Sequence, residues 1–216
     1  MPRFRGRKSK IGNTIYNHIL NNKREYLTVT ILFFIGLIMS VILFNNLSEE
    51  NLIEITTYLN ELFNNIKNYE NIDLLKILKE AIIYNFTITL LLWFGASTII
   101  GIPIVYGTII LKGFSIGYTI SSILTVYGAG KGMLIAISFM LLHNIIFVPT
   151  MFAISVSGVK LYKSIMKNKQ RENIKLEILR HTIFCFIMLL GMAISAFVET
   201  YLSTNISVLL LKNIKI

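Results

Sequence analysis

The chain has 216 residues, of which 54% are hydrophobic and only 15% are charged. The apolar residues fall into long runs with almost no charge, a distribution typical of a chain solvated by lipid rather than of a soluble domain. The net charge of +10 lies mainly in two basic blocks beside apolar runs. It therefore indicates membrane topology and contact with anionic lipid. Few aromatic or polar side chains separate the basic residues, which disfavours nucleic acid as a partner.

Residues 1–26 form a polar, basic segment. The first apolar run, 27–44, contains no charged residue, and at ~1.5 Å per residue it is about 27 Å long. That length suits one crossing of a bilayer core. The run is not followed by a small-residue cleavage pattern, so we expect it to be retained as the first membrane helix.

Residues 45–85 are acidic overall, with seven Asp or Glu residues against three Lys. Apolar residues recur at steps of three and four from Ile55 to Ile66 and from Leu74 to Ile82. This spacing predicts two amphipathic helices with a break around 68–71. We expect them to pack on the bundle; the alternatives are contact with the membrane surface or with a partner protein.

The stretch 86–127 is apolar except for Lys112. One straight helix of that length would measure about 63 Å, twice the thickness of a bilayer core. We therefore predict two spans, 86–111 and 113–128, with a turn where the charge of Lys112 meets the helix breaker Gly113. A glycine-rich turn at 128–132 leads to the next span, 132–158. Its Gly-Lys step lacks the rest of the Walker pattern, which argues against phosphate binding.

A second basic segment, 159–180, precedes the last span, 181–201. Basic flanks mark the cytoplasmic side of a membrane, which puts 1–26 and 159–180 inside the cell and the loop 45–85 outside. An even number of crossings must separate the two basic segments, in agreement with two spans within 86–128. The sequence thus predicts an all-α, polytopic membrane helix bundle over 27–216. It has about five transmembrane helices and an extracytoplasmic amphipathic helical loop.

Several polar residues in the spans are candidate structural or partner-contact sites. His143 and Asn144 are expected near the middle of the fourth span, where hydrogen bonding between helices is the main interpretation and a proton or ion relay is the alternative. A catalytic role would need a second ionisable group close to His143. Pro149 should kink the same helix. Glu199 is expected near the outer interface, in a structural role or as a docking point for an external partner.

Other candidates shape the backbone. Gly101 and Pro103 are expected to interrupt the second span. Gly113 and Gly117 form a small-residue face that allows a neighbouring helix to approach closely. The sequence contains no HExxH, GxSxG or CxxC pattern, and it has one cysteine. We therefore expect no catalytic, metal-binding or cofactor-binding residues, and no enzyme activity.

Several short segments occur in a distinctive order. They are Lys23–Tyr26, Leu92–Gly95, Ile100–Pro103, Leu111–Tyr118, the His143-Asn144 pair with Pro149, and Phe197–Tyr201. The set resembles the stage II sporulation protein M family of endospore-forming bacteria, from about residue 20 to the C-terminus. Two positions depart from the family pattern. The family often has Pro-His-Gly or Pro-Gln-Asn at 142–144, and it often has a glutamate where this chain has Phe147.

The resemblance implies a non-catalytic membrane scaffold. Its partners would be stage II sporulation proteins D and P, which degrade peptidoglycan while the mother-cell membrane engulfs the forespore. The resemblance also implies a location at the sporulation septum and the engulfing mother-cell membrane. The charge bias described above predicts a cell-membrane protein with its N-terminus in the cytoplasm and its C-terminus outside. The alternative function is a small transporter or channel subunit with His143 in its pathway. We expect contact with lipid, but no cofactor, nucleic acid or small-molecule substrate.

Overall fold

The computed structural model describes residues 18–68, 73–98, 101–167 and 171–213, and no strand occurs in these ranges. The all-α class predicted from the sequence is confirmed. The elements, with η for a π-helical segment, are α2 (Lys23–Asn45), α3 (Glu49–Asn68), α4 (Leu74–Ser97), α5 (Gly101–Ala136), η1 (Ile137–Leu141), α6 (Leu142–Lys167), α7 (Arg171–Phe197), η2 (Val198–Ser203) and α8 (Thr204–Asn213).

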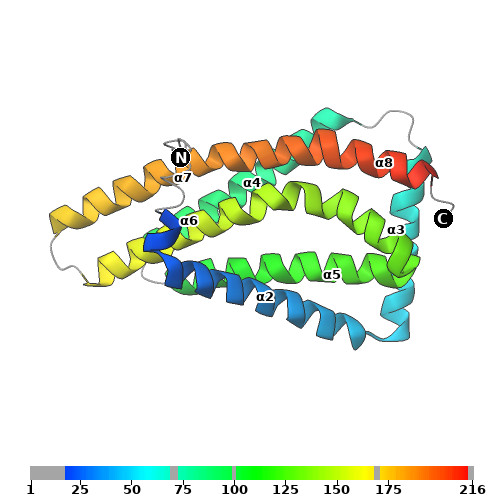
Figure 1. Ribbon diagram of the computed structural model, residues 1–216, viewed down its shortest axis with the longest axis horizontal. Coiled ribbons are helices and arrows are strands. Elements are labelled where there is room, and N and C mark those ends of the chain that lie inside the picture. Colours follow the sequence, from blue (N-terminus) through cyan, green and yellow to red (C-terminus); the bar gives the residue numbers. More distant parts are fainter. Residues whose placement is uncertain (1–17, 69–72, 99–100, 168–170, 214–216) are drawn as a thin grey trace, which may run out of the picture.

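The long helices run side by side, and α3 lies across one end of them (Figure 1). We call this the α3 end; it also carries α8 and the start of α4. The opposite end, where α2 begins and α6 gives way to α7, we call the basic end. Its basic side chains include Lys23, Arg24, Lys160, Lys163, Lys175 and Arg180.

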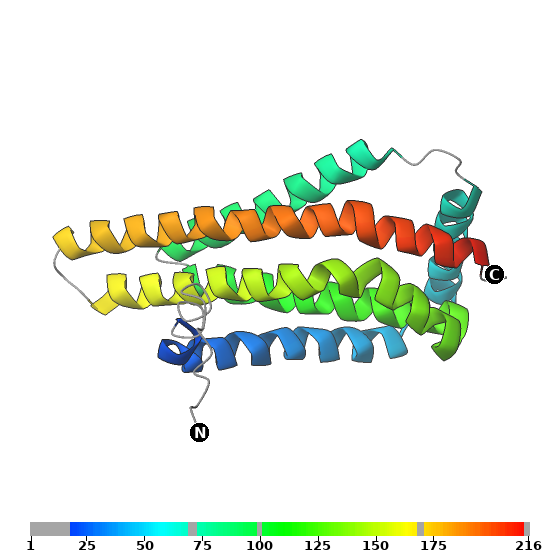
Figure 2. The same ribbon diagram turned by 45° about the horizontal axis from the view of Figure 1, so that its top comes forward.

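Four helical stretches are long and apolar enough to cross a membrane: Lys23–Asn45, Leu74–Ser97, Gly101–Met166 and Ile174–Lys212. The third is interrupted at Gly128, whose φ of 75° and ψ of 167° are not helical. Glycine adopts such a positive φ without steric strain. The chain reverses there, and α6 returns alongside α5 (Figure 2). This stretch therefore makes two passes, so the described chain passes along the bundle about five times, as predicted.

The outward faces of the long helices are apolar. Large side chains such as Phe34 on α2, Phe94 on α4 and Phe186 on α7 are 53%, 58% and 69% exposed. Soluble monomers rarely expose so much contiguous apolar surface, whereas lipid solvates it and leaves backbone groups to bond within helices. The fold is a multi-pass membrane helix bundle.

The turn between the second and third passes was predicted at the wrong place. Helix α4 ends at Ser97 and α5 begins at Gly101, whereas the sequence indicated a turn at Lys112 and Gly113. Helix α5 continues through both residues, so 86–111 and 113–128 are not the spans. The prediction failed because a charge in an apolar run was taken to mark the membrane surface.

Gly101 and Pro103 also have a different role from the one expected. They do not interrupt a span but begin α5. Proline suits the first turn of a helix, because the N–H that it lacks has no partner there. Glycine is required at the first position, since a Cβ on Gly101 would collide with the carbonyl oxygen of Gly95.

The segments flanking the predicted spans are more helical than expected. The second amphipathic stretch of 45–85 is not a separate surface helix, because α4 runs without interruption from Leu74 to Ser97. Part of the predicted break at 68–71 lies outside the described residues. The basic segment 159–180 is mostly continuous with α6 and α7, and the last helix continues through η2 and α8 to Asn213.

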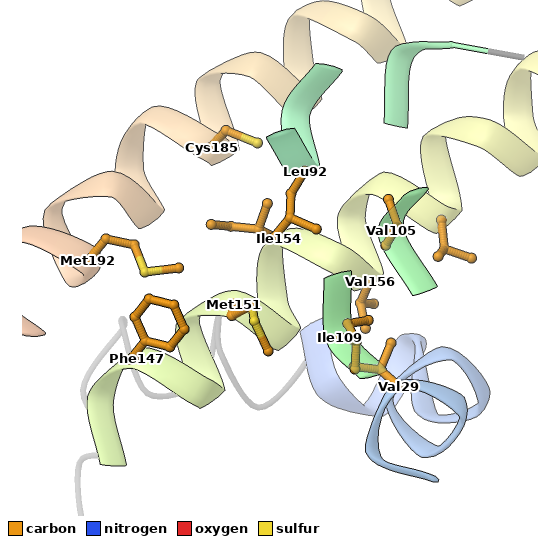
Figure 3. Packing of buried hydrophobic residues seen from close by; sticks show 11 residues of the cluster. Val29, Leu92, Val105, Ile109, Phe147, Met151, Ile154, Val156, Cys185 and Met192 are labelled. Carbon is orange, nitrogen blue, oxygen red and sulfur yellow. The ribbon is translucent and has the colours of Figure 1, made fainter. Parts of the chain in front are cut away.

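Two apolar cores hold the bundle together. The larger, shown in Figure 3, joins α2, α4, α5, α6 and α7 through Val29, Leu92, Val105, Ile109, Phe147, Met151, Ile154, Val156, Val159, Cys185 and Met192. The smaller lies at the α3 end and consists of Leu59, Phe63, Ile123, Ile135, Ala136 and Leu211. Helix α3 therefore packs on the bundle, which was the main expectation for its apolar stripe.

Candidate functional site

A partly buried lysine lies against aromatic side chains in the middle of α5. Lys112 of α5 lies beside Tyr84 of α4 and Phe147 of α6, and its Nζ donates to the Tyr84 hydroxyl at 3.4 Å. The same Nζ is 5.0 Å from the centre of the Tyr84 ring and 4.3 Å from the centre of the Phe147 ring. Aromatic faces attract an ammonium group, most strongly where water is excluded. The protein itself therefore solvates a charge that the sequence suggested would lie in a turn.

Glu199 and His143 complete this charged cluster, which we define as Tyr84, Lys112, His143 and Glu199. Lys112 interacts electrostatically with both the carboxylate of Glu199 and the imidazole of His143. Glu199 also interacts with Tyr84. The second ionisable group that a chemical role for His143 would need is therefore present, contributed by a different helix.

The charged cluster lies far from both ends of the long helices, and its side chains are partly exposed on the side of the bundle, with Tyr84 46% exposed. At ~1.5 Å per residue, Lys112 is about 16 Å from the start of α5 and about 24 Å from the reversal at Gly128. Glu199 does not lie at the end of a helix, as its expected place at the outer interface suggested: it interacts electrostatically with Lys112, and about 21 Å of helix follows it to Asn213. A carboxylate this far from the helix ends is energetically unfavourable in a membrane, and such residues usually have a specific structural or functional role.

A π-helical segment, η1, ends two residues before His143. In this segment and the following turn, the Asn144 side-chain amide donates to the carbonyl of Met140 at 2.8 Å, and the Ser195 hydroxyl of α7 donates to the carbonyl of His143 at 3.0 Å. The departure from regular α-helix thus lies at η1, upstream of Pro149, and α6 runs through Pro149 without ending. Such π segments are rare and occur frequently at functional sites.

A second π-helical segment contains Glu199. The carbonyl oxygen of Glu199 accepts from both the backbone N–H of Thr204, five residues later, and the Thr204 hydroxyl at 3.1 Å. The wider turn changes which side chains face the bundle in this part of the helix. Both π segments therefore adjoin an ionisable member of the charged cluster, and they also pack against each other.

The glycines of α5 have a structural role at the α2 interface. A Cβ on Gly113 would collide with the carbonyl of Phe33, and one on Gly36 of α2 would collide with the carbonyl of Ile110. Gly117 faces the same helix one turn further on. The two backbones therefore touch, as small residues allow in membrane helix pairs.

A serine, a histidine and a cysteine meet between α6 and α7. The Ser157 hydroxyl lies 2.9 Å from Nδ1 of His181, and Sγ of Cys185 lies 3.5 Å from its Nε2. A hydroxyl beside an imidazole suggests a nucleophile and its base. However, both partners lie within the described helices α6 and α7, whose backbone donors are used in the helices and do not form an oxyanion site. The contact ties α6 to α7.

Two further hydrogen bonds fix α4 against α7. The Asn85 side-chain amide donates to the carbonyl of Met192 at 2.8 Å, and Nε1 of Trp93 donates to the Thr182 hydroxyl at 3.0 Å. These partners, like Lys112 and Glu199, are far apart in sequence. The sequence could have indicated these contacts through the polar residues alone, because a polar side chain within an apolar run needs a partner inside the bundle. Among the described residues, no three His, Cys, Asp or Glu side chains come together as metal ligands.

Comparison with protein families matches residues 29–204 to the family described as stage II sporulation protein M. The match extends from α2 to the first residue of α8 and includes the whole charged cluster. No curated protein and no solved structure matches the chain. The resemblance that the ordered motifs indicated is confirmed. Because the match covers most of the chain, the protein belongs to the stage II sporulation protein M family, which implies a role in sporulation.

Proposed function

We propose that this protein is a non-catalytic membrane scaffold that localises a peptidoglycan-degrading complex during engulfment of the forespore. Stage II sporulation proteins D and P are the proposed partners. The observation that carries the proposal is α3, an amphipathic helix fixed across one end of a membrane bundle (Figure 1). A partner outside the lipid needs such an ordered surface to hold the scaffold.

The fixed position of α3 supports this role. Phe63 stacks on Phe139 of η1 at 5.4 Å between ring centres and lies 5.3 Å from the ring of Tyr127 of α5. The Tyr127 hydroxyl donates to Oδ1 of Asn60 at 2.9 Å. A helix held in this way offers a partner a preformed surface, so little ordering entropy is lost on binding.

The exposed face of α3 is acidic. Glu50, Glu54, Thr57 and Glu61 follow one another at helical spacing and are exposed. Beside them lies a cavity of about 540 Å³ between α3, the start of α4, η1 and α8, whose lining includes Glu61 and the largely exposed Tyr58. The lining also includes Asp73 and Lys76. The acidic face of α3 beside a mainly apolar hollow suits a partner that presents basic residues around an apolar anchor.

The orientation follows from charge. The basic end carries an excess of Lys and Arg side chains, whereas the α3 end mixes Lys76, Lys79 and Lys212 with acidic residues. An excess of Lys and Arg flanks the cytoplasmic side of membrane helices. This supports our proposal that α3 lies on the extracytoplasmic side, where peptidoglycan is, in the septum and the engulfing membrane. Leu59 and Phe63 do not contact the partner in this arrangement, because they are buried beneath α3.

The test replaces Glu50, Glu54 and Glu61 together by Gln and measures co-purification with proteins D and P. The matched control is Glu177→Gln, the same chemical change at the basic end. We expect recovery of the partners to fall several-fold for the α3 variant only, since acidic groups at an interface rim mainly affect encounter and specificity. Full recovery with an unchanged melting temperature would refute α3 as the docking surface.

A channel or transporter subunit is the second candidate, and the charged cluster is the observation that favours it. Against it, Phe147, Met151, Ile154 and Met192 are closely packed and at most 1% exposed on the side of the cluster toward the basic end (Figure 3). Proteoliposomes should therefore conduct no ions. A flux that depends on His143 would favour the channel over the scaffold.

A further inference from the structure

Three buried hydroxyls near the charged cluster lack a hydrogen-bond partner within the protein. They belong to Thr200 and Ser203 of η2 and Ser207 of α8, each at most 2% exposed. Every other buried serine or threonine hydroxyl in the described residues donates to a main-chain carbonyl, as Thr108 does to Ile104 at 2.8 Å. These three hydroxyls are therefore available to another group, and leaving them unpaired in an apolar bundle is unfavourable.

Two more unpaired atoms lie on the segment that faces them. Nδ1 of His143 and Oδ1 of Asn144 have no partner in the protein, and Asn144 is 6% exposed. Helix α6 packs against η2, and η1 packs against both η2 and α8. All five unpaired buried atoms of the described chain thus belong to consecutive or mutually packed segments, and we call these five side chains the polar seam.

The polar seam connects two features already described. At the α3 end, Thr204 and Phe139 line the cavity of about 540 Å³, and Thr204 is next to Ser203. At its inner end, Thr200 is next to Glu199 and Asn144 is next to His143, both members of the charged cluster. Polar atoms spaced in this way, each with free hydrogen-bonding capacity, are the setting in which buried water is retained.

The seam is closed toward the basic end. The Phe147 ring that contacts Lys112 belongs to the larger apolar core, and Met151, Ile154 and Met192 continue that core between α6 and α7 (Figure 3). An apolar, closely packed region of this kind stays dry. The cavity that adjoins the seam in the described residues is the one at the α3 end, so water would enter the seam from that end.

We propose that a file of water molecules runs along the polar seam from the cavity at the α3 end to the charged cluster, and that Glu199 exchanges protons with the medium through it. A hydronium ion in the file transfers its proton to the Glu199 carboxylate, which leaves a water molecule and a neutral carboxylic acid beside the Lys112 ammonium. The other titratable groups around this pair are Tyr84 from α4 and His143 from α6. The bundle then has a proton-binding site between its two ends that exchanges protons with one side of the membrane.

The first test measures access. Ser203→Cys and Thr200→Cys are compared with Leu202→Cys in lipid nanodiscs, using Ag⁺, a thiol-reactive cation small enough to follow water. Leu202 has the same depth but is 51% exposed on the outer face. Because thiolates form only in contact with water, both seam variants should react at least about tenfold faster than Leu202→Cys. The native Cys185, inside the dry core, is the internal control and should stay unreactive.

The second test measures the proton. In infrared difference spectra recorded between two pH values, the carboxylic acid band of Glu199 should appear at the lower pH. It should shift on transfer to D₂O and vanish in Glu199→Gln but not in Glu61→Gln, the control at the rim of the cavity. Equal silver reactivity of Ser203→Cys and Leu202→Cys, an inert Thr200→Cys, or the absence of a Glu199 band would each overturn the proposal. Neither test involves the partners of α3. The proposed scaffold function can therefore be refuted while the proton-binding proposal stands, and the reverse.

Discussion

Two glycines of α5 form a matched pair that tests how the bundle is packed. A Cβ on Gly107 would have no atom within 4 Å, whereas a Cβ on Gly113 would collide with the carbonyl of Phe33 and lie 3.3 Å from the backbone nitrogen of Leu37. The obstacles at Gly113 are main-chain atoms, which cannot rotate away as a side chain does. An added methyl group must therefore push α2 away from α5.

The two substitutions, Gly107→Ala and Gly113→Ala, are expected to change the free energy of unfolding in opposite directions. Gly→Ala in a helix interior is favourable by about 0.5–1 kcal/mol, which is the whole effect expected for Gly107→Ala. At Gly113 the same gain is opposed by an overpacking cost of about 1–3 kcal/mol, and more if the helices separate. Gly113→Ala should therefore be less stable than Gly107→Ala by about 1–3 kcal/mol.

The assay is reversible unfolding by SDS in mixed micelles, followed by tryptophan fluorescence. Trp93 is the single tryptophan, and its bond to Thr182 makes its emission sensitive to the packing of α4 on α7. If Gly113→Ala were as stable as Gly107→Ala, the two backbones would not be in contact, and the account of the α2–α5 interface would be wrong.

Three further predictions concern the charged cluster, the turn and pH. Lys112→Met and Glu199→Gln should each destabilise the bundle, because each removes one of two opposite charges that interact electrostatically. The double variant should recover about 0.5–3 kcal/mol in a double-mutant cycle; strictly additive losses would show that the two charges do not interact. Lys112→Cys should resist bulky maleimides in membranes while Ser97→Cys at the end of α4 reacts, and the reverse order would restore the turn at 112. Burial and the nearby Lys160 lower the pKa of His18 below its usual value, so the unfolded state binds more protons. Stability should therefore fall as pH drops below about 6.5, and His18→Gln should remove this dependence in a pH series of melting temperatures.

The sequence by itself determined the fold class of the protein and the approximate number of its membrane-spanning passes. Membrane insertion depends on hydropathy summed over each run, which is a local property, so the apolar runs indicated a multi-pass bundle directly. The acidic amphipathic stretch around Leu59 and Phe63 likewise predicted a helix that buries one face, and α3 does so. The ordered motifs indicated the family for a similar reason, because they follow one another along the chain.

The tertiary structure alone decided the location of the turn and the composition of the charged cluster. A charge within an apolar run indicates either a turn or a buried partner, and only the fold distinguishes the two. Tyr84 lies 28 residues before Lys112, and Glu199 comes from the last long helix. No local sequence pattern predicts these interactions, because they form only when four separate helix segments pack together. Lys112 can therefore stay inside the bundle, and the chain turns instead before Gly101, where no charge marks the position.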